Sequence, residues 1–343
     1  MSQSYFGSGA QKLTRVIPRS GGAPAPTIQL VSTQVLSPGD VHRAREAIAG
    51  RLHRTPVFTS ASLGPRVYLK AELFQRTGSF KPRGVLNKLA SLTEDARRAG
   101  VIGISAGNHA QALAYCSALE GIDSLVVMWE GASAQKIEAT KRYGATVDLE
   151  ADGPGGDFDR LATLLEETGR TLVHPFDDPL VIAGQGTVGL EILEDVPDTA
   201  VIVVPCGGGG LVSGIAVAAE GRRVLAVEPE LSPALHDGLE AGHSVPVEPQ
   251  SIADGLSAPF AGESALAICR DVGVESVLVT EGEIADGMRF LYTRAKLACE
   301  PAAAVGVAAL RAGKVAVGDG PVMVVVSGGN VAPETATAIL RPA

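Results

Sequence analysis

A lysine in the segment TGSFKPRG, residues 77–84, is the first residue whose setting suggests chemistry. Lys81 follows an aromatic residue, Phe80, and precedes a proline, and two glycines lie in the same short stretch. Most lysines are solvated surface residues, and taken alone this segment leaves that interpretation open. An amine in a glycine-flanked turn is also suited to forming a covalent bond with an aldehyde.

Four consecutive glycines, Gly207, Gly208, Gly209 and Gly210, follow an apolar strand pattern and precede a helical pattern that begins at Leu211. The bare backbone N–H groups of such a turn, with the positive end of a helix dipole, bind phosphate. A tight turn that needs positive φ explains one or two glycines but not four. The run therefore indicates an anion site.

A second glycine motif, GQGTVG at 184–189, matches the dinucleotide fingerprint and precedes a helical pattern. The segment before it, HPFDDPLVIA, has two prolines and two aspartates instead of a strand pattern. The following strand also ends without the acidic residue that would hold a ribose. These departures disfavour a dinucleotide, and no P-loop sequence occurs.

The segment ISAGNHAQ at 104–111 places Ser105, Gly107, Asn108 and His109 between a strand pattern and an alanine-rich helix. Such a turn offers a helix N-terminus, an amide and an imidazole to a small anion such as an amino-acid carboxylate. Single histidines are more often structural than catalytic, so an acid–base role for His109 is disfavoured.

Lys81, the glycine run, the Ser/Asn/His turn and SGGN at 327–330 together indicate a phosphorylated cofactor that is bound through an amine. Pyridoxal phosphate has these requirements: an aldehyde for a Schiff base, a phosphate for an anion nest and a ring nitrogen that needs a polar partner.

Alternating strand and helix patterns must position these groups. One series begins with SLVVMW at 124–129, and a second runs from AVIVVP at 200–205 to MVVVSGGN at 323–330. This order indicates an α/β fold of βαβ units, with two sheets that frame one cleft. The first 34 residues are rich in Ser, Gly, Pro, Ala and Gln and predict a flexible extension without a secretory signal. A capped helix pattern at Ser37 predicts the start of folded structure.

Composition excludes several classes of protein. The 343 residues are 45% hydrophobic and 20% charged, which is typical of a globular chain large enough for two or three packed units. A net charge of −9 without a basic stripe argues against a nucleic-acid partner, and no apolar run approaches membrane-spanning length. The four scattered cysteines indicate neither a disulfide framework nor a zinc cluster and favour a reducing cytoplasm.

Six motifs occur in the order found in the fold type II pyridoxal-phosphate enzymes: TGSFKPRG, SAGNHAQ, the GGGG run, IADGL, CEPAAA and SGGN. Over about residues 35 to 340 the chain resembles their threonine/serine dehydratases and serine racemase relatives. The resemblance implies a two-domain α/β fold like that of the tryptophan synthase β subunit, with open parallel or mixed sheets flanked by helices and the cofactor in the interdomain cleft. It implies a large domain of residues 35–99 and 178–343, a small domain of residues 100–177 and no C-terminal regulatory domain.

The resemblance also assigns roles. Lys81 is expected to form the Schiff base, Phe80 to pack against the cofactor ring and Asn108 to hydrogen-bond the ring hydroxyl. Ser327 is expected to face the ring nitrogen, with Glu300 close by, and a hydroxyl partner there favours rapid loss of a β-leaving group. The phosphate is expected on Gly207, Gly208, Gly209, Gly210 and Leu211, and the substrate on Ser105, Ala106, Gly107, Asn108, His109 and Gly255.

Two departures from the family pattern bear on activity. Racemases of this family carry a serine where this chain has Ala106, so dehydration is favoured over racemisation. The family's cation site uses a glutamate that corresponds to Glu228, but its later acidic position is Ala234 here. A metal site of the family type is therefore not expected, although Glu228 and Asp237 could form a looser one.

The resemblance predicts a lyase that removes water from L-threonine or L-serine to give a 2-oxo acid and ammonia, acting as a homodimer on a small amino acid. Three alternatives stay open: an amino-acid racemase, a β-eliminase for another substrate such as 3-hydroxyaspartate or phenylserine, and a non-catalytic binding protein. Retention of the lysine, the asparagine, the glycine run and Ser327 argues against the last of these.

Overall fold

The computed structural model describes residues 13–15, 28–30, 36–129, 132, 134–151, 153–316 and 318–341. Strands β1 (Leu13–Arg15) and β2 (Ile28–Leu30) form an antiparallel pair, and the rest of the predicted N-terminal extension lies outside the described residues. Helix α1 (Pro38–Ile48) starts directly after Ser37, which forms a capping box with Asp40. This confirms the predicted start of the helix.

The larger sheet has six strands, of which only the edge strand β3 runs antiparallel to its neighbour. Valine-rich sequence accounts for the parallel part, because such strands are buried on both faces. In spatial order the strands are β11 (Glu275–Val279), β10 (Arg223–Pro229), β9 (Val201–Pro205), β12 (Val322–Val326), β4 (Val67–Ala71) and β3 (Val57–Thr59).

Side chains of this sheet alternate between two apolar cores. On β9, Val201 and Val203 pack in a core with helices α11 (Glu281–Phe290) and α12 (Pro301–Arg311). Ile202 and Val204 point to the opposite face and pack with α7 (Pro179–Asp195) and α8 (Gly210–Ala218). Helices thus cover both faces of the large sheet, as the pattern of apolar strands requires.

The smaller sheet has four parallel strands, in the order β7 (Thr146–Ala151), β6 (Ser124–Trp129), β5 (Val101–Ile104) and β8 (Thr171–Leu172). Its two faces are covered by α2 (Pro82–Ala90) and α4 (Asn108–Glu120) on one side and by α6 (Gly153–Thr168) on the other. The further helices are α3 (Glu94–Ala99), α5 (Ala134–Arg142), α9 (Ala234–Ala241), α10 (Glu263–Val272) and α13 (Pro333–Leu340).

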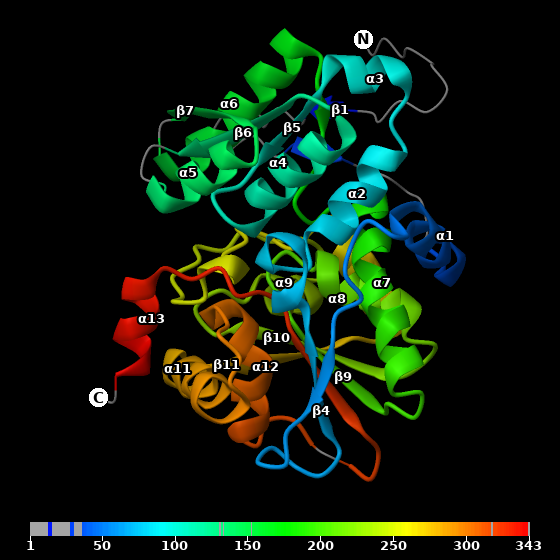
Figure 1. Ribbon diagram of the computed structural model, residues 1–343, viewed down its shortest axis with the longest axis vertical. Coiled ribbons are helices and arrows are strands. Elements are labelled where there is room, and N and C mark those ends of the chain that lie inside the picture. The colour runs from blue at the N-terminus through cyan, green and yellow to red at the C-terminus, as the bar shows by residue number, and fades with distance from the viewer. Residues whose placement is uncertain are drawn as a thin grey trace.

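Figure 1 shows the two sheets as separate layers, the smaller one above the larger, with α2 and the upper part of α7 at their junction. The parallel strands of both sheets end in loops that meet between them. Since ligands of open α/β sheets bind at the carboxyl ends of the strands, this junction is the expected site. We propose that the two sheets mark the two domains, because all four strands of the smaller one fall within residues 100–177.

The motif GQGTVG lies inside α7, not at its start. A Cβ on Gly184 would come within 2.5 Å of the carbonyl oxygen of Arg83, and one on Gly186 within 2.6 Å of the carbonyl oxygen of Gly214. These glycines let α7 touch α2 and α8 backbone to backbone. The literal match to a dinucleotide fingerprint is therefore a helix-packing motif.

None of the helices in the described part of the chain is long and apolar enough to span a membrane. The four cysteines, Cys116, Cys206, Cys269 and Cys299, are buried and unpaired.

Candidate active site

A cavity of about 1180 Å³ lies between the two sheets. Its walls include the loops after β5, β9 and β12 and the start of α2, so four separate segments converge on it. All the residues predicted to bind cofactor or substrate line this cavity: Phe80, Lys81, Ser105, Ala106, Gly107, Asn108, His109, Gly207, Gly208, Gly209, Gly210, Leu211, Gly255, Glu300 and Ser327.

Lys81 immediately precedes α2, whose first residue is Pro82. Its amine donates a hydrogen bond to the carbonyl oxygen of Pro175, 2.8 Å away, and lies 5.2 Å from the centroid of the Phe80 ring. Burial lowers the pKa of this amine to about 8, and the nearby Glu300 carboxyl acts in the opposite direction. A larger fraction of neutral amine is therefore present near neutral pH than for a surface lysine.

The loop before Lys81 is bound to the loop after β12. The N–H of Phe80 donates to the carbonyl of Ser327 at 3.2 Å, and the N–H of Gly329 donates to the carbonyl of Gly78 at 2.9 Å. Thr77 has a φ of 60°, a left-handed conformation that is uncommon for a residue other than glycine. The loop is thus held in a fixed conformation beside Ser327, which is buried at the end of β12.

A chain of side-chain hydrogen bonds crosses the cavity wall. The amide of Asn330 donates to the carbonyl oxygen of Asn108 at 2.8 Å, and Asn108 donates to the Glu300 carboxyl at 2.7 Å. Burial raises the pKa of Glu300 to about 8, helped by Asp254 and opposed by the Asn108 hydrogen bond and by Lys136 and Lys81. Asn108 is thereby oriented, and Glu300 holds a proton across much of the neutral range.

The glycine run forms the turn between β9 and α8. Gly209 has a φ of 92°, and a Cβ on Gly208 would lie 2.4 Å from the Phe176 ring. Larger residues would therefore displace this turn from its place against Phe176. The first N–H groups of α8 have no acceptor within their own helix, and an anion is a suitable partner for them.

His109 is buried, and its Nε2 lies 2.8 Å from the carbonyl oxygen of Val173. Its Nδ1 has no hydrogen-bond partner in the described structure. Burial lowers the pKa of His109 to about 3, and that of the neighbouring His174 to about 4. Both rings are neutral at physiological pH, so neither supplies a cation to the cavity.

Several cavity residues carry no signal in the sequence patterns. Phe176 packs edge to face with both His174 and Phe260, and these rings form an aromatic wall. Lys136 of the small sheet's α5 makes an ion pair with Asp254, and both line the cavity. The HPFDD segment lacks a strand pattern, and its proline and aromatic ring have no periodicity that could place it in the cavity wall.

Glu228, the possible metal ligand, lies outside the cavity lining. Its carboxyl oxygens accept hydrogen bonds from the N–H groups of Leu235 and His236, at 2.7 and 2.9 Å, and from the Ser276 hydroxyl at 3.1 Å. Burial raises the pKa of Glu228 to about 8. Within the described residues, no group of three or more His, Cys, Asp and Glu side chains could hold a metal ion.

Comparison with known proteins identifies the family. The model of the pyridoxal-phosphate dependent enzymes matches residues 48–328. The chain belongs to this family. Among its relatives, it is 42% identical over 301 residues to the L-threonine ammonia-lyase of Thermotoga maritima, which covers 85% of this chain and 75% of that protein. It is 40% identical to the catabolic L-threonine dehydratase of Escherichia coli K12, covering 85% of this chain and 92% of that one.

Solved structures of this family agree with the fold. The structure of maize serine racemase superimposes with a TM-score of 0.84 at 35% identity, covering 88% of this chain and 96% of that one. A bacterial-type threonine deaminase, whose source is given as T.th., superimposes with a TM-score of 0.80 at 37% identity, covering 86% of this chain and 99% of that one. The fold type II architecture implied by the sequence motifs is thereby confirmed.

The cavity suits the family's cofactor. It contains an amine whose pKa is lowered, a helix N-terminus opened by glycines, and the unpaired Nδ1 of His109. These groups match an aldehyde, a phosphate and further polar atoms of a ligand.

Proposed function

We propose that this pyridoxal-phosphate enzyme converts L-threonine or L-serine to the corresponding 2-oxo acid and ammonia. The observation that carries the proposal is the meeting of Lys81, Asn108, the glycine run and Ser327 in one cavity, from positions up to about 250 residues apart. Relatives named as threonine ammonia-lyases, about 40% identical over most of the chain, support the choice of substrate.

Each residue around the cofactor has a proposed role. Lys81 binds its aldehyde carbon, and Phe80 packs against its ring. Asn108, already oriented by Asn330, hydrogen-bonds the ring hydroxyl, and Ser327 faces the ring nitrogen. The glycine run and the N-terminus of α8, with Leu211, hold the phosphate.

Pyridoxal phosphate supplies an amine-reactive aldehyde and a conjugated ring that withdraws electrons from the α-carbon of a bound amino acid. Lys81, once its amine is free, removes the proton from that α-carbon; an amine with a pKa of about 8 is suited to accept it at neutral pH. The bond between the β-carbon and its hydroxyl group then breaks, and water leaves. A second water molecule replaces the amino group, which departs as ammonia and leaves a 2-oxo acid.

The turn before α4 is the proposed site for the substrate carboxylate. Residues 105–107 precede the helix, and their N–H groups with the helix N-terminus attract an anion. The neutral His109 ring and the backbone at Gly255 complete this part of the wall.

Ala106 favours elimination over racemisation. Racemisation requires a proton donor and an acceptor on opposite faces of the α-carbon, and the methyl group of Ala106 can do neither. The structural similarity to a serine racemase therefore reflects the shared fold of the two proteins.

The function is tested by offering the cofactor-loaded enzyme L- and D-threonine, L- and D-serine, threo-3-hydroxyaspartate and 3-phenylserine. We expect 2-oxo acid and ammonia in equal amounts from L-threonine or L-serine, with no change of chirality in the unreacted amino acid. Inverted amino acid without oxo acid would establish a racemase. Turnover of only hydroxyaspartate or phenylserine would assign a different β-elimination.

We further propose that the enzyme is a cytoplasmic homodimer. Four unpaired buried cysteines are suited to a reducing compartment. Phe58 on the edge strand β3 and Phe74 are 40% and 48% exposed and pack edge to face, which is typical of a surface that a second subunit covers. Light scattering on the purified protein tests the dimer, and a monomer at micromolar concentration would contradict it.

A further inference from the structure

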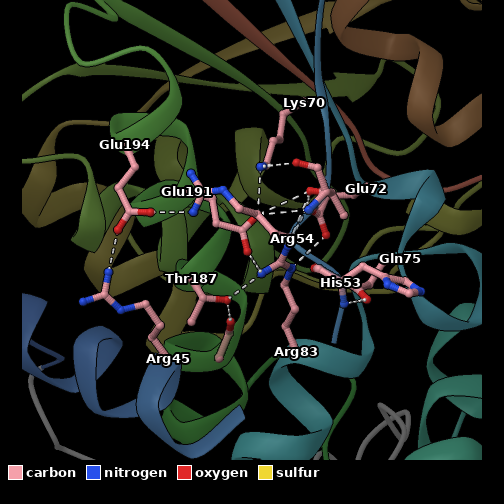
Figure 2. Close-up of polar contacts among 12 residues, drawn as sticks. Arg45, His53, Arg54, Lys70, Glu72, Gln75, Arg83, Thr187, Glu191 and Glu194 are labelled. Carbon is pink, nitrogen blue, oxygen red and sulfur yellow. Dashed lines mark hydrogen bonds and ion pairs between the residues drawn. The ribbon is translucent and has the colours of Figure 1, made fainter. Parts of the chain in front are cut away.

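The face of α2 that points away from the cavity carries a buried arginine. Arg83 lies two residues after Lys81 and is 1% exposed. Figure 2 shows its guanidinium group among side chains that come from β4, from the turn after it and from α7.

Every N–H of the Arg83 guanidinium group has a hydrogen-bond partner. Nε and Nη2 donate to the two oxygens of Glu72, both at 2.8 Å. Nη1 and Nη2 donate to the two oxygens of Glu191 at 2.8 and 3.0 Å, and Nη1 also donates to the Thr187 hydroxyl at 3.2 Å. Two fork-shaped pairs of this kind fix both the position and the orientation of the group.

The partners of Arg83 are themselves anchored. Lys70 of β4 is fully buried and donates to Glu191 and Asp195, at 2.8 and 3.2 Å, and to the carbonyl of Thr55 at 2.8 Å. Glu72 accepts a further hydrogen bond from the Thr55 hydroxyl. The network therefore ties the first turn of α2 to the central strands of the large sheet and to α7 (Figure 2).

Backbone packing at the same place leaves α2 little room. A Cβ on Gly84 would lie 2.6 Å from the carbonyl oxygen of Val181, and one on Gly184 would lie 2.5 Å from that of Arg83. Two helices in such close contact can still rotate about the contact point. The paired carboxylates of Glu72 and Glu191 remove that freedom, because they hold Arg83 from two directions.

We propose that Arg83 is a positioning residue: its paired guanidinium group fixes the start of α2 so that the Lys81 amine stays at the wall of the cavity. The inference rests on the proposed role of Lys81 as the amine that binds the cofactor. Arg83 itself does not line the cavity and acts only through the backbone it shares with Lys81.

The test compares two charge-conserving substitutions in the same helix. Arg83→Lys keeps the charge but loses the fork geometry. Lys88→Arg, the control, perturbs a second buried pair of α2, between Lys88 and Asp178 at 2.6 Å, in the last turn of the helix. Both variants should lower the melting temperature of the full chain.

The deciding measurement follows Lys81 directly. The full chain, stripped of cofactor, is acylated across a pH series, and mass spectrometry of the peptide that contains Lys81 gives its pH midpoint. Glu300, His109 and His174, whose charges act on Lys81, are unchanged in both variants. We expect Arg83→Lys to raise the midpoint by about half a unit or more, because the amine becomes better solvated, and Lys88→Arg to leave it unchanged.

Kinetics of the reloaded enzymes supply the second readout. With L-threonine, Arg83→Lys should reduce kcat roughly tenfold to a hundredfold with KM altered less, since a displaced base weakens the transition state more than the bound substrate. If Arg83→Lys and Lys88→Arg lose stability alike and leave both the Lys81 midpoint and kcat unchanged, Arg83 is structural only and the proposal is wrong.

If Arg83→Lys does not fold, Glu191→Gln replaces it, because this change keeps the Glu72 pair and the shape of the network. A smaller upward shift of the Lys81 midpoint is then expected, and an unchanged midpoint would overturn the proposal. The acylation readout needs no substrate, so failure of the proposed reaction would leave this test intact.

Discussion

The two sides of the first turn of α2 treat buried charge in opposite ways. On the cavity side, the Lys81 amine has one carbonyl partner, and burial lowers its pKa to about 8. On the opposite side, burial acts to lower the pKa of Arg83, but Glu72 and Glu191 outweigh it and the pKa is raised.

The difference shows what each side is built for. A buried charge with complete partners holds its elements in place, and removing one partner leaves another charge unpaired in the interior. A buried amine with few partners is kept near the point where it can lose its proton, which is typical of reactive residues. Sequence neighbours at positions 81 and 83 therefore serve chemistry and architecture separately.

The largest effect is expected from removing the amine. Lys81→Ala should reduce turnover of L-threonine by about 10⁴-fold or more, because the same group binds the cofactor and moves the proton. Its melting temperature should change little. Lys70→Met, on the opposite side, should lose stability yet keep the absorbance band of the bound cofactor. A Lys81→Ala enzyme with normal turnover would end the assignment.

Next in size is the loss of the guanidinium group. Arg83→Met leaves the Glu72 and Glu191 carboxylates facing each other without their shared cation. We expect a loss of about 3–5 kcal/mol in the free energy of unfolding, measured by denaturant titration. A loss below about 1 kcal/mol would show that water reaches this network and that the two sides are less different than proposed.

Glu300 sharpens the comparison through pH. Burial raises its pKa to about 8 from an ordinary 4.5, so between these values the folded chain holds a proton that the unfolded chain has lost. The Glu300 contribution to stability therefore falls as pH rises through this window. Glu300→Gln removes that loss, and the cofactor-free variant should gain on the order of 2 kcal/mol over wild type between pH 5 and pH 9.

Thermal melts of both proteins across this pH range test the effect of Glu300. The difference in melting temperature should grow with pH, and a constant difference would mean that the Glu300 carboxyl is already ionised at low pH.

The smallest effect is expected for an ion pair on the surface. Arg98 and Asp95, on α3, are paired while their side chains are 76% and 87% exposed. Asp95→Asn should change the free energy of unfolding by less than about 0.5 kcal/mol, because water screens the pair. A larger change in urea titration would show that pairing alone, without burial, accounts for the Arg83 side of the comparison.

Local features of the sequence were enough to predict much of this protein. The strand patterns at 124–129 and 200–205, the cap at Ser37 and the glycine run before α8 all appear where they were expected. Each depends on residues within a few positions of one another, since periodicity, capping and turn chemistry are short-range properties.

The tertiary structure decided what the local patterns could not. GQGTVG satisfies a binding fingerprint letter by letter, yet it lies inside α7 because α2 and α8 need close approach there. Arg83 finds its partners 11 and 108 positions away, at Glu72 and Glu191. Which charges are buried together, and hence which lysine is left with a reactive amine, depends on long-range packing that no short stretch of sequence encodes.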